Sequence, residues 1–242
     1  MAWFIFDLDD TLLITSAIYE KARKEFAQTL IDAGVEQSPE EIIQLLNKID
    51  WENRKTLDVS KERLVISMFQ TYCILMNRHG LKVEDEARDV FAAIMQKVYN
   101  HRYRLVWSAR KVLTEMKNRG HRLILYTRGD EDLQKRKIKE ARLNEFFERI
   151  FIVSRKSVQQ LETILHSVGI QPEEAWGVGD EILTDVEHSL TLGMKVIRVW
   201  GYHEHEPATL PESDRLHNIK SLVHILPLLD QIEQIEKKGE AR

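Results

Sequence analysis

Two aspartates near the amino terminus are the residues of this sequence best suited to do chemistry. Asp7 and Asp9 follow an apolar run at residues 3–6. Because side chains alternate along an extended backbone, we expect both carboxylates to point the same way and to lie close together. Neighbouring carboxylates repel each other unless a cation neutralises them, and two or three oxygen ligands with several waters are typical of Mg²⁺. The pair therefore predicts a magnesium site.

Polar side chains follow three later apolar runs in the same way. They are Thr127 after residues 122–126, Lys156 after residues 150–153, and Asp180 with Asp185 after residues 175–178. A hydroxyl beside the start of a helix, as expected for Thr127, suits a phosphate oxygen. Lysine supplies a point charge for a nucleophile or a phosphoryl group. These residue types favour the binding of a phosphoryl group near a cation.

The elements that must position these residues alternate between strand and helix. Strands are predicted at residues 3–8, 122–126, 150–153, 175–178 and 194–199, and helices at residues 130–143, 157–168 and 181–192. Near-continuous apolar strands joined by helices are typical of a parallel sheet covered on both faces. The carboxyl ends of such strands meet at one edge, where ligands bind. We therefore predict a doubly wound α/β core with the polar residues at that edge.

The chain between the first two predicted strands has a helical period instead. Apolar residues recur every three or four positions in four segments, and Ser38 and Glu41 are spaced for a capping box at the start of the second. Four amphipathic helices can bury their apolar stripes against each other. The predicted domains are therefore a core of residues 1–15 and 105–242, with a further helix near residues 108–120, and an inserted helical bundle of residues 16–104.

Composition narrows the class of protein further. The 242 residues include 35 basic and 39 acidic side chains, a net charge of −4 that gives no basic surplus for nucleic-acid binding. The single cysteine, Cys73, cannot form an intramolecular disulfide, and this predicts a reducing compartment such as the cytoplasm. No apolar run approaches the ~18 residues of a membrane span. We expect a monomer or homodimer without nucleic-acid or membrane partners.

The polar residues, taken in order, resemble the motifs of the haloacid dehalogenase (HAD) superfamily of phosphotransferases. The first motif, Asp-x-Asp-x-Thr, is matched by Asp7, Asp9 and Thr11, the second by Thr127, the third by Lys156, and the fourth by Gly179, Asp180 and Asp185. All four occur in order at predicted strand ends. The family commonly inserts a helical cap between its first two motifs, where residues 16–104 lie. Glu181 departs from the pattern, since Ser is common there.

The resemblance implies a Mg²⁺-dependent phosphomonoester hydrolase with a Rossmann-like core and a helical cap. Asp7 would be the nucleophile that forms an aspartyl phosphate, and Asp9 the general acid and base. Thr127 and Lys156 would hold the phosphoryl group. Mg²⁺ would be bound by Asp7, the backbone carbonyl of Asp9 and Asp180, with Asp185 orienting Lys156 or a metal-bound water. A dehalogenase lacks the second acid of the first motif, so Asp9 favours phosphate chemistry on a small phosphorylated metabolite.

Other interpretations compete with parts of this prediction. A phospho-receiver domain uses similar residues, but its acceptor lies on a later strand, and a catalytically idle interaction module would also have this fold. Asp10 and Thr11 could serve only as turn or capping residues, and this interpretation is preferred for Asp10 alone. The lysines at positions 135, 137 and 139 are expected on a solvated helix face. Arg128 could contact substrate or water. His203 and His205 resemble a metal-binding tract in a polar loop, and a second metal site there is disfavoured.

Overall fold

The computed structural model describes residues 2–57, 62–201 and 210–231, which form two compact units. One unit comprises Met1–Ser16, Tyr103–Arg128 and Gln134–Arg242, and the other comprises Ala17–Arg102 and Gly129–Leu133. The sequence boundaries lay at residues 15/16 and 104/105. The short segment Gly129–Leu133 differs from that expectation, because its contacts group it with the helical unit although it follows a core strand in the chain.

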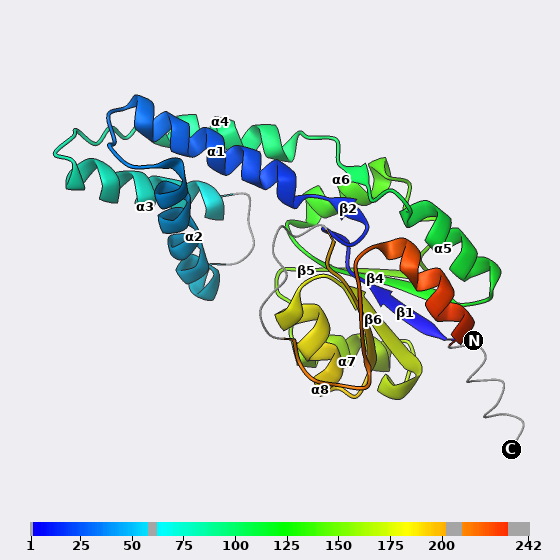
Figure 1. The fold of residues 1–242 in the computed structure, drawn as a ribbon. Coiled ribbons are helices and arrows are strands. Elements are labelled where there is room, and N and C mark those ends of the chain that lie inside the picture. Colours follow the sequence, from blue (N-terminus) through cyan, green and yellow to red (C-terminus); the bar gives the residue numbers. More distant parts are fainter. Residues whose placement is uncertain (1, 58–61, 202–209, 232–242) are drawn as a thin grey trace, which may run out of the picture. The chain divides into compact units, whose positions relative to one another are not determined.

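The α/β unit is built on one six-stranded parallel sheet with strand order β5-β4-β1-β6-β7-β8 (Figure 1). The strands are β1 (Trp3–Phe6), β4 (Arg122–Arg128), β5 (Arg149–Val153), β6 (Ala175–Gly179), β7 (Lys195–Val199) and β8 (Leu216–Ile219). The first five confirm the predicted strands within a few residues. The sequence did not predict β8, a short edge strand whose two central residues, His217 and Asn218, break the apolar pattern. The fold is the predicted doubly wound sheet.

Helices cover both faces of this sheet. From β1 the chain first proceeds outward to β4 and β5, and then crosses back to β6 and β7 on the other side of β1. Because such connections are right-handed, the helices of the first group and those of the second group lie on opposite faces of the sheet. On one face, Ile5 and Ile124 pack with Leu161 and Leu165 of α7 (Val158–Ser167). Figure 1 shows α5 (Ala109–Asn118) on the other side of the sheet from α7 and α8 (His188–Thr191). The central strand β1 is thereby enclosed, and its carboxyl end positions Asp7.

A two-stranded ribbon joins the chain segments on either side of the helical insertion. The strands β2 (Leu13–Ile14) and β3 (Arg104–Leu105) pair antiparallel, and the Val106 amide donates to the Leu12 carbonyl at 2.9 Å. Two-residue strands leave too short an alternation to be predicted from sequence. The ribbon fixes the start and the end of the insertion to each other within the α/β unit.

The helical unit contains the four predicted amphipathic helices, α1 (Ser16–Asp32), α2 (Pro39–Thr56), α3 (Arg63–Arg78) and α4 (Ala87–Tyr99). Ser38 and Glu41 form the expected capping box at the start of α2. The helices share one apolar core, in which the rings of Phe26 and Phe91 meet edge-to-face at 5.0 Å. No helix in the described part of the chain is long and apolar enough to cross a membrane.

Candidate active site

Three carboxylates meet at the carboxyl edge of the sheet. Asp7 follows β1, Asp180 follows β6, and Asp185 lies in the π-helical turn η2 (Ile182–Glu187). One oxygen of each carboxylate lies within 4.8 Å of the others. All three residues are largely buried. The sequence pattern placed these acids at one edge, and the structure brings them within reach of a single cation.

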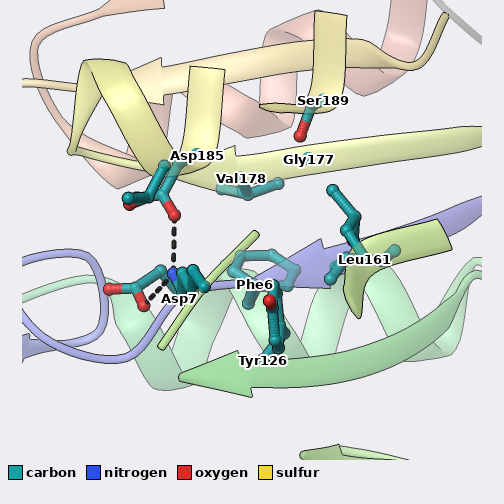
Figure 2. A pocket seen from close by; sticks show the side chains of 11 residues that line it. Phe6, Asp7, Tyr126, Leu161, Gly177, Val178, Asp185 and Ser189 are labelled. Atoms are coloured by element: carbon teal, nitrogen blue, oxygen red, sulfur yellow. Dashed lines mark hydrogen bonds and ion pairs between the residues drawn. The ribbon is translucent and has the colours of Figure 1, made fainter. Parts of the chain in front are cut away.

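Lys156 lies between two of these carboxylates. Its Nζ donates to Oδ1 of Asp7 and to Oδ1 of Asp185, each at 2.6 Å, and the lysine side chain is 4% exposed. Figure 2 shows that dashed contacts from Asp7 and Asp185, which both line the pocket, meet at one nitrogen atom, the Nζ of Lys156. Burial lowers the pKa of Lys156, but the two carboxylates more than offset this effect and raise it. Lys156 is therefore a fixed positive charge beside Asp7.

The acidic cluster carries more negative charge than this lysine neutralises. Burial raises the pKa of Asp7 well above its usual range, Lys156 lowers it, and the neighbouring carboxylates raise it further. A divalent cation bound to these oxygens would favour the ionised form, because an opposite charge at close range stabilises a carboxylate. Carboxylate oxygens are the ligands that Mg²⁺ takes in proteins, together with water. The residues present therefore fit a magnesium ion.

Local backbone geometry explains how Asp185 reaches the cluster. A Cβ on Gly179 would collide with the Asp185 carboxyl group, so only glycine lets that side chain lie against the end of β6. The Glu181 amide donates to Oδ2 of Asp185 at 3.1 Å. The sequence predicted an α-helix over residues 181–192, whereas residues 182–187 form a π-helix and only His188–Thr191 are α-helical. The wider π turn is frequent at functional sites.

Asp180 is held by two residues from distant parts of the chain. The Thr11 hydroxyl donates to its Oδ1 at 3.1 Å, and Nε of the buried Arg198 donates to its carbonyl at 3.2 Å. The sequence left open whether Thr11 is only a turn or capping residue, and in the structure its hydroxyl contacts a carboxylate of the cluster. Arg198, on β7, was not singled out because its sequence neighbours mark only a buried strand.

Asp9 faces a different set of partners. Its carboxylate accepts from Lys137 Nζ at 2.8 Å and from Gln134 Nε2 at 2.9 Å. Gln134 Nε2 also donates to the hydroxyl oxygen of the buried Thr127 at 2.7 Å, and this contact joins the end of β4 to the second acid. Among the described residues, the side chains of Asp7, Asp180 and Asp185 lie close enough together to hold a metal ion, and the side chain of Asp9 is not one of this group. The side chain of Asp9 is therefore positioned by donors, separately from the acidic cluster.

The prediction that Lys137 lies on a solvated helix face is wrong. Its side chain is 2% exposed, and its Nζ lies 4.5 Å from the centre of the Tyr103 ring. In α6 (Glu131–Glu140), residues two positions apart point in nearly opposite directions, whereas residues four apart share a face. Lys135 and Lys139 are indeed exposed, and Lys137 must face the other way. This helical spacing was a signal in the sequence that could have found Lys137.

Known proteins resemble the chain over most of its length. A family model described as haloacid dehalogenase-like hydrolase matches residues 4–199. The chain belongs to this family. A relative named glyceraldehyde 3-phosphate phosphatase, from Pyrococcus furiosus, is 30% identical over 200 residues, which cover 79% of this chain and 78% of that protein. The family resemblance inferred from the four motifs is confirmed.

Solved structures of this hydrolase family share the fold. A haloacid dehalogenase-like family hydrolase from Xanthomonas campestris has a TM-score of 0.81 at 21% identity, covering 100% of this chain and 95% of its own. An L-2-haloacid dehalogenase from Xanthobacter autotrophicus has a TM-score of 0.64 at 14% identity, covering 95% and 98%. At these identities the likeness concerns the fold alone. The chemistry of this haloacid dehalogenase-like hydrolase must therefore be argued from its own residues.

Two further predicted positions in this hydrolase have structural partners. Asp10, with φ of 58°, accepts from the backbone amides of Thr15 and Ser16 at 2.9 Å each, which confirms its interpretation as a turn residue. Arg128 pairs with Glu181 at 3.4 Å, and both side chains are partly exposed. His203 and His205 lie outside the described residues.

Proposed function

We propose that this haloacid dehalogenase-like hydrolase is a Mg²⁺-dependent phosphomonoester hydrolase that acts through an aspartyl phosphate. The observation that carries the proposal is the contact between Lys156 and Asp7 inside the three-carboxylate cluster. The second acid, Asp9, lies two residues further along the chain and accepts a hydrogen bond from Lys137. A buried carboxylate beside a fixed lysine and a cation-binding cluster is suited to attack a phosphorus atom whose oxygens carry negative charge.

In the first step, an oxygen of Asp7 attacks the phosphorus in line, and the bond between phosphorus and the leaving oxygen breaks. Asp9 donates a proton to that leaving oxygen, which departs as an alcohol. In the second step, water attacks the phosphorus, Asp9 accepts the proton of that water, and the bond to Asp7 breaks to release phosphate. Covalent catalysis thereby divides one difficult displacement into two easier ones.

The other residues of the site hold the reacting groups. Lys156 and the hydroxyl of Thr127 would bind oxygens of the transferring phosphoryl group and offset its charge. Mg²⁺, held by Asp7, the Asp9 carbonyl and Asp180, would supply the remaining positive charge to the phosphoryl oxygens. Asp185, which contacts Lys156 in the described structure, would keep that lysine aimed at the nucleophile.

The substrate class that we propose is a small phosphorylated metabolite, and the name of the Pyrococcus relative makes glyceraldehyde 3-phosphate the first compound to test. The core residues recognise only a phosphoryl group, which every candidate shares. We therefore assign selectivity to the helical unit. A cytoplasmic location agrees with this substrate class and with the single cysteine.

The proposal is tested by hydrolysis of 4-nitrophenyl phosphate with and without Mg²⁺. The Asp7→Asn variant should show no turnover and no phosphoenzyme, and chelation of Mg²⁺ should abolish the activity of the unaltered protein. Glu187→Gln makes the same acid-to-amide change at an exposed position two residues from Asp185 and serves as the control. Full activity of Asp7→Asn would show that the proposed nucleophile is wrong. An unaltered protein that is idle with Mg²⁺ would refute the hydrolase function and favour an interaction module.

A further inference from the structure

A buried amide, Gln134, lies between two groups of the α/β unit that the proposed reaction uses separately. Gln134 is the fourth residue of α6, and it is only 1% exposed. Its Nε2 donates to Oδ2 of Asp9 at 2.9 Å, to the Thr127 hydroxyl oxygen at 2.7 Å and to the Arg128 carbonyl at 3.2 Å. One side-chain nitrogen thereby contacts both the second acid and the end of β4.

These neighbours determine which end of the amide faces them. The Asp9 carboxylate and the Arg128 carbonyl can only accept hydrogen bonds, so the nitrogen of Gln134 must face them. Its Oε1 is buried, and among the described residues it has no hydrogen-bond partner. A buried carbonyl without a partner is costly, and a methionine would fill a similar volume without that cost. The amide at this position therefore indicates a need for its donors rather than for its bulk.

The contact with Gln134 determines how the Thr127 hydroxyl can act. Because the amide nitrogen can only donate, the Thr127 oxygen accepts, and its own hydrogen is left for another acceptor. In the part of the chain that the structure describes, this is the only hydrogen bond of the Thr127 side chain. In the register of β1 and β4, Phe6 is opposite Leu125. Thr127 therefore lies beside the chain that leaves β1 with Asp7, at the edge where a phosphoryl group would bind.

The same amide completes the contacts of Asp9. Lys137 donates to Oδ1 of Asp9 at 2.8 Å, and Gln134 donates to Oδ2. Gln134 and Lys137 are three positions apart in α6 and therefore share a face of that helix. Two donors on different oxygens fix the plane of a carboxylate, which one donor alone leaves free to rotate. The orientation of Asp9 thus depends on Gln134 as well as on Lys137.

We infer that Gln134 is a positioning residue that makes Thr127 a donor toward the phosphoryl group and orients Asp9 toward the leaving oxygen. This inference rests on the proposed phosphatase function and deepens it, because one buried side chain would then serve both phosphoryl binding and proton transfer. Gln134 itself does not need to contact the substrate. Its role is exerted through two hydrogen bonds that a space-filling side chain cannot make.

The contact with Thr127 is tested by the binding of inorganic phosphate in the presence of Mg²⁺, measured by calorimetry. Gln134→Met should raise the Kd about threefold or more, the factor that corresponds to the net contribution of a neutral hydrogen bond. In a Thr127→Val background the same substitution should have little further effect, because the hydroxyl through which it acts is gone. Gln159→Met, at an exposed glutamine of α7, is the matched control. An unchanged Kd, or equal rises in both backgrounds, would overturn the inference.

The contact with Asp9 is tested by release of the leaving group in a single turnover, which excludes the second chemical step from the measured rate. In Gln134→Met, release of glycerol from glycerol 3-phosphate should slow by about tenfold or more, because a hydrogen bond to a charged group is lost. Release of nitrophenol from 4-nitrophenyl phosphate should slow less, since a phenolate needs less help from an acid. Losses by the same factor with both substrates would also overturn the inference.

Two further measurements separate the possible causes of failure. Circular dichroism with thermal unfolding shows whether Gln134→Met folds. If it does not, Gln134→Asn replaces it, because this variant keeps the amide but is one methylene too short to maintain the same contacts, and the same two effects are expected. Absence of 4-nitrophenyl phosphate turnover by the unaltered protein would instead refute the proposed function, while the phosphate titrations would still show whether Gln134 acts on Thr127.

Discussion

Replacing Lys137 by methionine removes the ammonium group that holds Asp9 and leaves a side chain of similar length in its buried position. The Nζ of Lys137 lies 2.8 Å from Oδ1 of Asp9, whose side chain is 30% exposed. Hydrogen bonds to charged groups contribute about 1.5–3 kcal/mol. Because water partly screens Asp9 and Gln134 still donates to it, we expect the lower end of that range. Such a loss lowers the equilibrium constant between the held and the displaced conformations of the Asp9 side chain by about tenfold.

The assay separates a role through Asp9 from general damage to the fold. With an alkyl phosphate such as glycerol 3-phosphate, Lys137→Met should lower kcat about tenfold or more. With 4-nitrophenyl phosphate the loss should be smaller, since a phenolate leaves with less help from an acid. Lys139→Met, two residues away on the exposed face of the same helix, is the matched control. Lys137→Arg should recover part of the rate, because it restores a cation beside Asp9.

Equal losses with both substrates would argue against this reasoning, unless the second chemical step limits both. A burst of released nitrophenol decides between these cases, because a burst requires that the first step remains fast. Equal losses without a burst, or no loss with either substrate, would show that Lys137 does not act through Asp9. A lower midpoint of thermal unfolding alone, with normal kcat, would assign it a purely structural role.

Two other substitutions test separate contacts. Thr11→Val removes the hydroxyl that donates to Asp180, so the Mg²⁺ concentration for half-maximal activity should rise about 10-fold or more. Thr11→Ser keeps a hydroxyl and should restore the original Mg²⁺ requirement. An unchanged Mg²⁺ titration of Thr11→Val would contradict the role of this contact. Asp50→Asn should lower the free energy of unfolding at pH 7, measured by urea unfolding, because Arg54 and Arg63 lose their carboxylate. We expect a loss of about 3 kcal/mol, the lower end of the range for a broken buried ion pair, because Arg54 is partly exposed. Burial raises the pKa of Asp50, but these arginines outweigh it and lower the pKa, so its stabilisation is present above about pH 4 and fades as the pH falls through the folded-state pKa. The difference between Asp50→Asn and the unaltered protein should therefore shrink in acid, and a constant difference would contradict the ion-pair explanation.

The sequence by itself determined the sheet, the inserted helices and most of the residues at the sheet edge. Apolar runs such as residues 122–126 fix buried strands, and parallel strands must bring their carboxyl ends to one edge. Asp7, Lys156 and Asp185 therefore had to converge once the strand order placed β1 between β4 and β6. The helical period of the insertion predicted its four helices for the same kind of reason, because burial of an apolar stripe depends on local spacing.

Only the tertiary structure decided which polar side chains face each other. Lys137 lies 128 residues from Asp9 in the chain, and Thr11 lies 169 residues from Asp180, so no local pattern specifies either contact. The Asp185 side chain can lie against the end of β6 only because Gly179 has no Cβ, and this contact between backbone and side chain appears only when β6 and η2 are packed. Hydrophobic periodicity determines where a side chain is buried, whereas the partner of a buried charge is determined by packing between distant elements.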